Sequence, residues 1–362
     1  MRMTNVYQKP ESAGGVFGDV KTRDEVLAQI QGNPAVHEEF LKLRPEFQER
    51  FTQFCMGVRG VQMTYDPFFI KIFDAEIHPK RLSKFLSKIL GRRLKIKRML
   101  PNEHKRITDR GSLLIMDILV EFETGELADV EIQKVGYLFP GQRASCYSSD
   151  MVMRQYERIR SAKGEDFSYK DLKKVYTIVI MENSSQELKA VPEYYIHRGR
   201  CEFDSGLKLN LLQEFYFISL DVFLDIMDNR GKEAKISELE AWLYFIGSDK
   251  VEHIQRVITS YPWFAEMYEE IGEFRRHPEE AIRMFSDALK ILDENTVRYM
   301  IDEMKQEIEE KDGTIDGLKG MVGELEGTVG ELEGTVKEKD GKIEELEKII
   351  KELQKELQKK VH

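Results

Sequence analysis

The sequence predicts an α/β protein in which helices flank a mixed β-sheet, followed by a helical appendage and a C-terminal coiled coil. Between about residues 80 and 182 the apolar patterns follow the order helix, strand, strand, strand, helix, strand. A helical crossover from the third strand to a fourth puts parallel and antiparallel strands in one sheet. Residues 237–304 are helical in composition, and apolar residues then recur every seven positions from 308 to 357.

The composition indicates a globular protein with a sizeable core. The chain has 362 residues, of which 41% are hydrophobic and 33% charged. No stretch approaches the run of about 18 apolar residues that crosses a bilayer, and the N-terminus lacks an apolar signal core. We therefore expect a cytoplasmic protein without a membrane partner. Its three cysteines are far apart and form no CxxC spacing, so reduced thiols are expected.

The charge is unevenly distributed along the chain. The net charge of the chain is −10. Much of it comes from residues 301–362, which hold 18 acidic and 11 basic residues. Residues 80–110, by contrast, hold 12 Lys and Arg and only two acidic residues. Because a local basic field matters more for phosphate binding than the net charge, a nucleic-acid partner remains compatible with this acidic protein.

The pattern divides the chain into four segments. Residues 1–60 form a polar leader and N-terminal helices, 61–235 the sheet domain, 236–305 the helical appendage and 306–362 the coiled-coil tail. In KRLSKFLSKILG (80–91) the apolar residues follow the i, i+3, i+4, i+7 spacing of an amphipathic helix. LKIKRML (94–100) then alternates like a half-exposed strand, and further strand-like stretches follow at EYYIHRG and EFYFISLD.

A hairpin is predicted over residues 112–134, with one carboxylate in each arm. Asp117 lies in the first arm and Glu131 in the second. Because strand side chains alternate between faces, the two acids share a face only in one register. A three-residue loop, 123–125, with Gly125 at positive φ, places Asp117 opposite Glu131, whereas a two-residue loop separates them onto opposite faces.

Two directly opposed carboxylates repel each other unless a positive group lies between them. Mg²⁺, or Mn²⁺ in its place, takes one or two protein carboxylates together with water and phosphate oxygens. The alternative is that one carboxylate reaches solvent at a sheet edge or pairs with a Lys or Arg. The basic segment immediately before the hairpin favours a metal site that acts on a phosphodiester.

A long helix is predicted over 139–164, followed by a buried strand, KVYTIVIME, at 174–182. On this helix, polar residues at spacings of three and four form one stripe. The stripe consists of Arg143, Tyr147, Asp150, Arg154 and Arg158.

The tail carries a heptad repeat. The a positions are Ile308, Ile315, Val322, Val329, Val336, Ile343, Ile350 and Leu357. The d positions are Leu318, Leu325, Leu332, Leu346 and Leu353, with Lys311, Lys339 and Lys360 as exceptions. β-Branched residues at a with Leu at d favour a parallel two-stranded coiled coil, so we expect a homodimer. Glycines at outward positions weaken the part before Val336 by about 0.5–1 kcal/mol each.

These stretches together resemble a known family. YDPFFIKIF, LPNE, SLLIMDILVEF, DVEIQK, FPGQRASCYSSDMVMRQY and KVYTIVIME are similar to the PD-(D/E)XK nuclease family transposases, the Rpn-like recombination-promoting nucleases. The resemblance covers roughly residues 45–305. It implies the PD-(D/E)XK restriction-endonuclease-like fold for the mixed sheet and its flanking helices.

The resemblance also implies roles for individual residues. Asp117 and Glu131 correspond to the metal-binding acids, and Gln133 to the third catalytic motif residue, which is Lys in most of the superfamily. Arg143 and Tyr147 are candidate phosphate or leaving-group contacts. Asp66 and Glu103 are possible further ligands, although a turn cap and a loop surface position explain them equally well.

The expected function is therefore a metal-dependent DNA endonuclease linked to transposition or recombination. The candidate contacts to the phosphate backbone are Lys84, Lys88, Arg92, Arg93, Lys95, Lys97 and Arg98. A non-catalytic DNA-binding or scaffold protein that dimerises through its coiled coil is the alternative. RNA also stays open as a substrate, because a basic groove alone does not read the 2′-hydroxyl.

Overall fold

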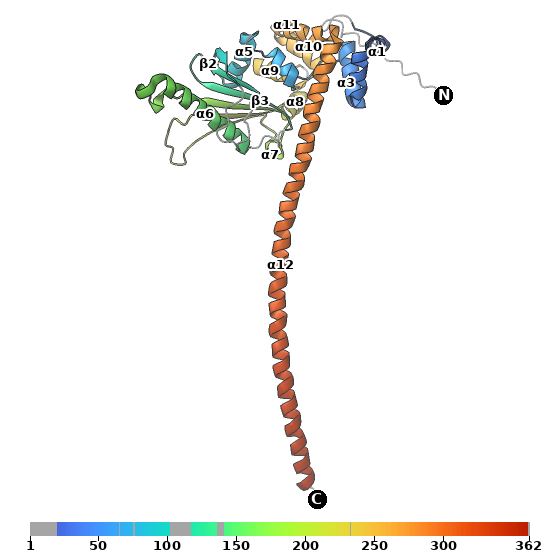
Figure 1. Cartoon of the computed structure of the whole chain (residues 1–362), viewed down its shortest axis with the longest axis vertical. Helices are drawn as coiled ribbons and strands as arrows, with labels where there is room; N and C mark the ends of the chain where they lie inside the picture. The colour runs from blue at the N-terminus through green and yellow to red at the C-terminus, as the bar shows by residue number, and fades with distance from the viewer. Residues whose placement is uncertain are drawn as a thin grey trace, which may run out of the picture. The chain divides into compact units, whose positions relative to one another are not determined.

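The computed structural model describes residues 20–64, 66–74, 77–101, 117–135, 141–231 and 233–360 (Figure 1). The chain separates into two compact units, 1–294 and 295–362. The predicted leader and residues 102–116, which include Glu103, lie outside the described residues. The predicted division into four segments stays a prediction.

The first unit contains one six-stranded mixed sheet with the strand order β1-β2-β3-β4-β6-β5. β1, β2 and β3 pair antiparallel, β3, β4 and β6 pair parallel, and β5 pairs antiparallel with β6. This arrangement confirms the predicted α/β class. The strands are β1 (Ile96–Met99), β2 (Ile118–Phe122), β3 (Leu127–Val135), β4 (Val175–Asn183), β5 (Ile196–Arg200) and β6 (Gln213–Ser219).

One face of the sheet is covered by a helix that precedes the strands in the chain and by helices that follow them. The helices α5 (Pro79–Ile89), α8 (Leu220–Asn229) and α9 (Glu238–Gly247) pack there. Further helices enclose the same hydrophobic core. They are α1 (Arg23–Gln31), α2 (Pro34–Lys42), α3 (Pro45–Met56), α4 (Asp66–Ile72), α10 (Val251–Ser260), α11 (Ala265–Glu273) and the first turns of α12 (Pro278–Lys360).

The apolar stripe of α5 is buried as its spacing predicts. Leu82, Phe85 and Leu86 are fully buried, and Gly91 follows the helix with a φ of 68°. The Phe85 ring lies 5.6 Å from Trp242 of α9, whose indole also contacts Phe264 at 4.8 Å between ring centroids. The predicted helical appendage therefore shares one continuous core with the sheet.

The opposite face of the sheet is covered by α6 (Gly141–Lys163), as Figure 1 shows. A smaller apolar cluster joins them, formed by Leu119, Leu127, Ala144, Tyr147, Met151, Val175, Val179 and Met181. This cluster contains only residues whose side chains point away from the main core, so the two faces of the sheet have separate interiors. The short α7 (Gln186–Lys189) follows β4.

The second unit consists of the remainder of α12. Its apolar side chains at the predicted heptad positions are exposed, for example Leu325 at 64% and Leu346 at 58%. Within the described ranges, no helix combines the length and apolar character needed to span a membrane. All three cysteines are free thiols.

The β2–β3 turn depends on one glycine. Gly125 has a φ of 85°, a conformation that costs an L-residue about 1–2 kcal/mol. An added Cβ would meet only the Lys173 Cγ at 3.4 Å, so the cost is in the backbone. We therefore expect Gly125→Ala to lower the free energy of unfolding by about 1–2 kcal/mol, measured by urea denaturation.

Gly141→Ala is the matched control, because its added Cβ meets no atom within 4 Å and its φ is not positive. Its unfolding free energy should stay within about 0.5 kcal/mol of the parent. Equal losses in both variants would contradict the role assigned to the Gly125 conformation.

Candidate active site

The hairpin has the register that brings its two carboxylates together. Leu119 pairs with Asp129 and Ile118 with Val130, so the next pair along the ladder is Asp117 with Glu131. The turn closes over residues 123–125, as the amide of Gly125 donates to the carbonyl of Phe122 at 2.9 Å. The three-residue loop predicted from the sequence is confirmed.

Asp117 and Glu131 are tied to each other through the backbone. The amide of Asp117 donates to Oε1 of Glu131 at 3.0 Å, and the amide of Ile132 donates to Oδ2 of Asp117 at 2.8 Å. Nε2 of Gln133 lies 3.4 Å from Oε2 of Glu131. The three predicted motif residues are therefore adjacent on the face of the sheet that α6 covers.

A third acid, Asp129, lies beside this pair and was not predicted as a site residue. Asp129 is on the same face of β3 as Glu131 and is 0% exposed. Among the described residues its carboxyl oxygens meet no basic or neutral hydrogen-bond partner, and its hydrogen-bonding neighbour is the carboxyl group of Glu131. The alternation in DVEIQ places positions 129, 131 and 133 on one face, so the signal was present in the sequence.

The acids strongly perturb one another because they are buried together. Burial is the main cause that raises the pKa of Asp129 well above its ordinary value, and the charge of Asp117 adds to it. Burial likewise raises the pKa of Glu131, with repulsion from Asp129 as the next cause. Removing solvent from like charges disfavours their ionised forms, and a nearby cation reverses this.

α6 presents two of its predicted residues to these acids. Nη2 and Nε of Arg143 donate to the Tyr147 hydroxyl at 2.8 and 3.2 Å. The charge of Arg143 lowers the pKa of both Asp129 and Glu131, although burial outweighs it. Burial also raises the pKa of Tyr147, and Glu131 contributes to that rise. The positive charges that act on Asp129 are those of Arg143 and, more weakly, Arg154.

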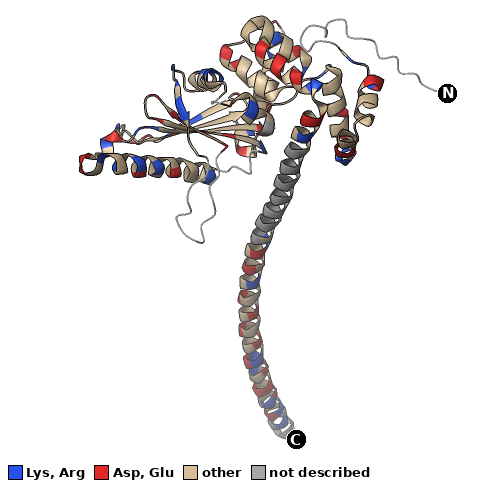
Figure 2. Cartoon of the chain, turned by 45° about the horizontal axis from the view of Figure 1, so that its top comes forward, with Lys and Arg blue, Asp and Glu red and all other residues tan. Residues whose placement is uncertain are grey.

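The rest of the predicted α6 stripe continues along the same face of the sheet. Nε of Arg154 donates to Oδ2 of Asp150 at 2.6 Å, and its Nη1 donates to the carbonyl of Pro101 at 2.7 Å. Nη1 of Arg158 donates to Oε2 of Glu121 at 2.7 Å. The stripe is therefore an inward-facing polar seam between α6 and the strands, and Figure 2 shows the basic residues along this helix.

Several of the predicted phosphate contacts lie on the other face of the sheet. Lys84 and Lys88 belong to α5, which packs opposite α6. The Lys84 ammonium lies 4.2 Å from the ring centroid of Trp263, and Lys88 pairs with Glu238. Nη2 of Arg92 contacts Glu126 at 2.7 Å. The structure does not bring these cations to the carboxylates.

Cations of β1, in contrast, lie beside α6. Nε of Arg98 donates to Oε2 of Glu121 at 2.8 Å, and the Lys97 ammonium lies 3.7 Å from Oε1 of the same residue. Burial raises the pKa of Glu121, but Arg98 and its neighbours outweigh this and hold it below the ordinary value. Arg93 and Lys95 are exposed, the latter 3.9 Å from Glu123.

The acids fit a hard divalent cation. Within the described ranges no three His, Cys, Asp or Glu side chains form a complete metal-ligand set. Mg²⁺ requires only one or two protein carboxylates, however, because water and phosphate complete its shell. The opposed Asp117 and Glu131 supply two such carboxylates.

A Ser-His-Asp arrangement elsewhere in the structure has a structural explanation. Oγ of Ser248 lies 2.7 Å from Nδ1 of His253, and Nε2 of His253 lies 3.4 Å from Asp228. Ser248 is only 4% exposed, and its hydroxyl also accepts from the amide of Lys250 at 3.3 Å. A buried hydroxyl that bonds His253 and the backbone amide of Lys250 is not placed to attack a substrate.

Comparison with known proteins shows the family to which the chain belongs. A family model described as PD-(D/E)XK nuclease family transposase matches residues 63–300, which include every element of the sheet. The chain belongs to this family. Searches of curated proteins and of solved structures return no match. Membership of this family indicates a nuclease-like function for the chain.

The raised pKa of Asp129 leads to a prediction for the metal-free protein. The folded state keeps this proton at pH values where the unfolded chain, with its ordinary pKa near 3.9, has released it. Stability is therefore lost as the pH rises from about 4 toward the folded pKa. Asp129→Asn should raise Tm in EDTA at pH 8 by about 2–4 °C for each kcal/mol gained, and the gain should disappear near pH 4.

Asp225→Asn provides the control, since it makes the same chemical change at an exposed position of α8. Its Tm should match that of the parent across this pH range. A lower Tm for Asp129→Asn at pH 8 would show that the ionised carboxylate stabilises the metal-free fold, contrary to this prediction.

Proposed function

We propose that the protein is a Mg²⁺- or Mn²⁺-dependent DNA endonuclease linked to transposition or recombination. The observation that carries the proposal is the strand register that sets Asp117 opposite Glu131. Two facing carboxylates repel each other, and a cation between them offsets that repulsion. Membership of a nuclease family supports a phosphodiester as the substrate.

In this proposal Asp117 and Glu131 hold the ion. A bound divalent cation supplies an activated water and stabilises charge on the phosphoryl oxygens. Gln133 lies within reach of the Glu131 carboxylate, and its amide can accept and donate hydrogen bonds. Its role is to orient the attacking water, but it brings no positive charge. Arg143, whose charge acts on both Asp129 and Glu131, is the group proposed to provide that charge.

The proposed phosphate-contact surface lies on the α6 side of the sheet. Glu121 is one carboxylate surrounded by three cations, Lys97, Arg98 and Arg158. This group therefore keeps a net positive charge, and the exposed Arg93 and Lys95 lie beside it in sequence. Such contacts predict DNA affinity that falls steeply with salt. Lys84 and Lys88 contribute little, because both already contact protein groups on the other face.

The assignment predicts the effect of removing one acid. Asp117→Ala should reduce Mg²⁺-dependent nicking of supercoiled plasmid at least about 100-fold, because the ion loses a ligand that stabilises the transition state. DNA binding measured in EDTA should change little, since the basic surface is intact.

Asp225→Ala controls for loss of an acid on the opposite side of the sheet and should nick at the parental rate. Equal nicking by Asp117→Ala and the parent would refute the catalytic assignment. DNA binding without nicking by the parent protein would favour the alternative, a non-catalytic scaffold.

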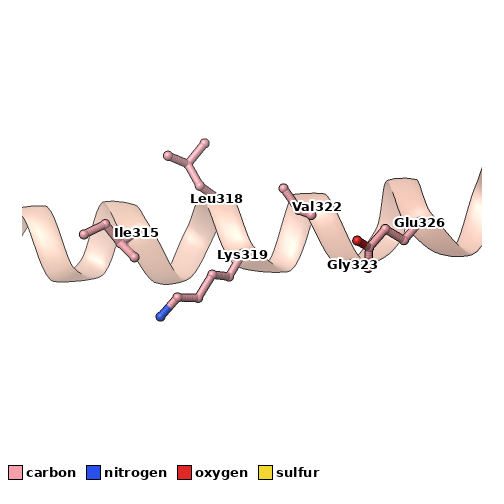
Figure 3. Close-up of a pocket in the computed structure, with 6 residues that line it drawn as sticks. All are labelled: Ile315, Leu318, Lys319, Val322, Gly323 and Glu326. Carbon is pink, nitrogen blue, oxygen red and sulfur yellow. The ribbon is translucent and has the colours of Figure 1, made fainter.

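We also propose that the protein forms a homodimer through the heptads of α12. The apolar side chains of the second unit protrude from successive turns, and Ile315, Leu318 and Val322 line a shallow hollow on the helix surface (Figure 3). Half or more of Leu318 and Val322 is exposed. A second copy of the same helix supplies the matching apolar seam, with a residues facing a and d facing d.

The dimer proposal is tested by two charge substitutions at neighbouring positions on different faces of the helix. Leu346→Asp places a charge at a d position in the glycine-free end and should convert a dimer to a monomer at micromolar concentration. Lys348→Asp, at the outward f position, should leave the dimer intact. Sedimentation equilibrium measures both, and a monomeric parent protein would exclude the homodimer.

A further inference from the structure

An aromatic cluster lies at the C-terminal end of α6, away from the carboxylates. Tyr156 of α6 and Tyr169 of the following turn have ring centroids 6.2 Å apart and planes inclined by only 14°. Phe167 meets both rings edge-on, at 5.4 and 5.3 Å. The three rings thus form one ordered stack-and-edge arrangement.

Packing does not explain the outermost ring of this cluster. Tyr169 is 72% exposed, so it gains little from burial. The turn that carries it is held by other groups: Ser168 and Asp171 form a capping box, and Lys163 pairs with Asp171 at 2.8 Å. The neighbouring Leu172 is buried. The Tyr169 ring is therefore held at the surface by a turn whose hydrogen bonds and ion pair do not involve the ring.

Three exposed cations lie near Tyr169 in the chain. The Arg160 guanidinium lies 5.5 Å from the ring centroid of Tyr156 and donates to its hydroxyl. Lys170 and Lys173 are exposed on either side of the buried Leu172. Of the seven Lys and Arg in residues 154–174, Arg154, Arg158, Lys163 and Lys174 form ion pairs with acids. The exposed cations of this segment that can contact phosphate are therefore Arg160, Lys170 and Lys173.

We infer that Tyr169 is a stacking platform for an unpaired nucleotide of the DNA. An exposed aromatic ring beside cations binds single strands, because the base stacks on the ring while the backbone contacts the cations. Paired bases in a duplex do not offer a free face to such a ring. The inference rests on the proposed function, in which DNA is the substrate.

The position of the platform fits one DNA molecule that contacts the protein both at the carboxylates and at Tyr169. Seventeen residues of α6 separate Arg143 from Arg160, which corresponds to about 25 Å along a helix. At about 3.4 Å per base pair, this distance is roughly seven base pairs of DNA. The platform would therefore hold an unpaired flank of the DNA outside the duplex that lies at the carboxylates.

The test compares two DNA ligands in EDTA, where no cleavage occurs. One is a blunt duplex, and the other is the same duplex with a single-stranded tail. Tyr169→Ala should weaken binding of the tailed duplex roughly 5- to 150-fold, the range measured for loss of one base–aromatic stack, and change blunt-duplex binding less than about 2-fold. Fluorescence anisotropy of labelled DNA gives both affinities.

Two control variants separate stacking from other effects. Tyr169→Phe keeps the ring and should bind both ligands like the parent. Tyr194→Ala removes another exposed tyrosine, at 62% exposure, outside this cluster and should also bind like the parent. Unchanged tailed-duplex affinity in Tyr169→Ala, or equal losses on both ligands, would overturn the platform while leaving the nuclease proposal intact. A parent protein that binds neither ligand would contradict both.

Discussion

Carboxylates that face each other in a desolvated interior repel, and the hairpin of β2 and β3 holds such groups together. The register is set by a turn of three residues whose last member, Gly125, has a φ of 85°. A shift of one residue would send Asp117 to the face covered by α5. The backbone amides of Asp117 and Ile132 then fix the orientation of the carboxylates. The strand register and the backbone hydrogen bonds thus position the two carboxylates without a bound ion.

The packing of α6 buries the acids and so raises the free-energy cost of ionising them. The helix covers the acids with Tyr147 and excludes water from Asp129, whose oxygens find no basic or neutral hydrogen-bond partner among the described residues. Arg143 offsets part of the cost but does not remove it, since the pKa of Glu131 stays raised. A site that is unfavourable when empty is well suited to bind a cation. The same helix carries cations along its length, and the exposed ring of Tyr169 lies in the turn that follows it.

Local patterns predicted much of this correctly. The alternation of side chains and one glycine were enough to predict the pairing of Asp117 with Glu131, and the apolar spacing of 80–91 predicted the buried stripe of α5. Both depend on residues close in sequence. Asp129 escaped notice because its burial depends on the packing of α6. The partners of Lys84 and Lys88, Trp263 and Glu238, lie about 150 residues or more away, so a local count of charges could not reveal them.

Metal binding is the most direct test of the central claim that the hairpin carboxylates exist to hold a cation. Electron paramagnetic resonance of Mn²⁺ titrated into the full chain should show one saturable site competed by Mg²⁺. The site should be lost in Glu131→Gln, which keeps the shape of the side chain but removes its charge, and retained in Asp225→Asn. Saturable binding that is equal in the parent and in Glu131→Gln, or no binding by the parent, would contradict the account.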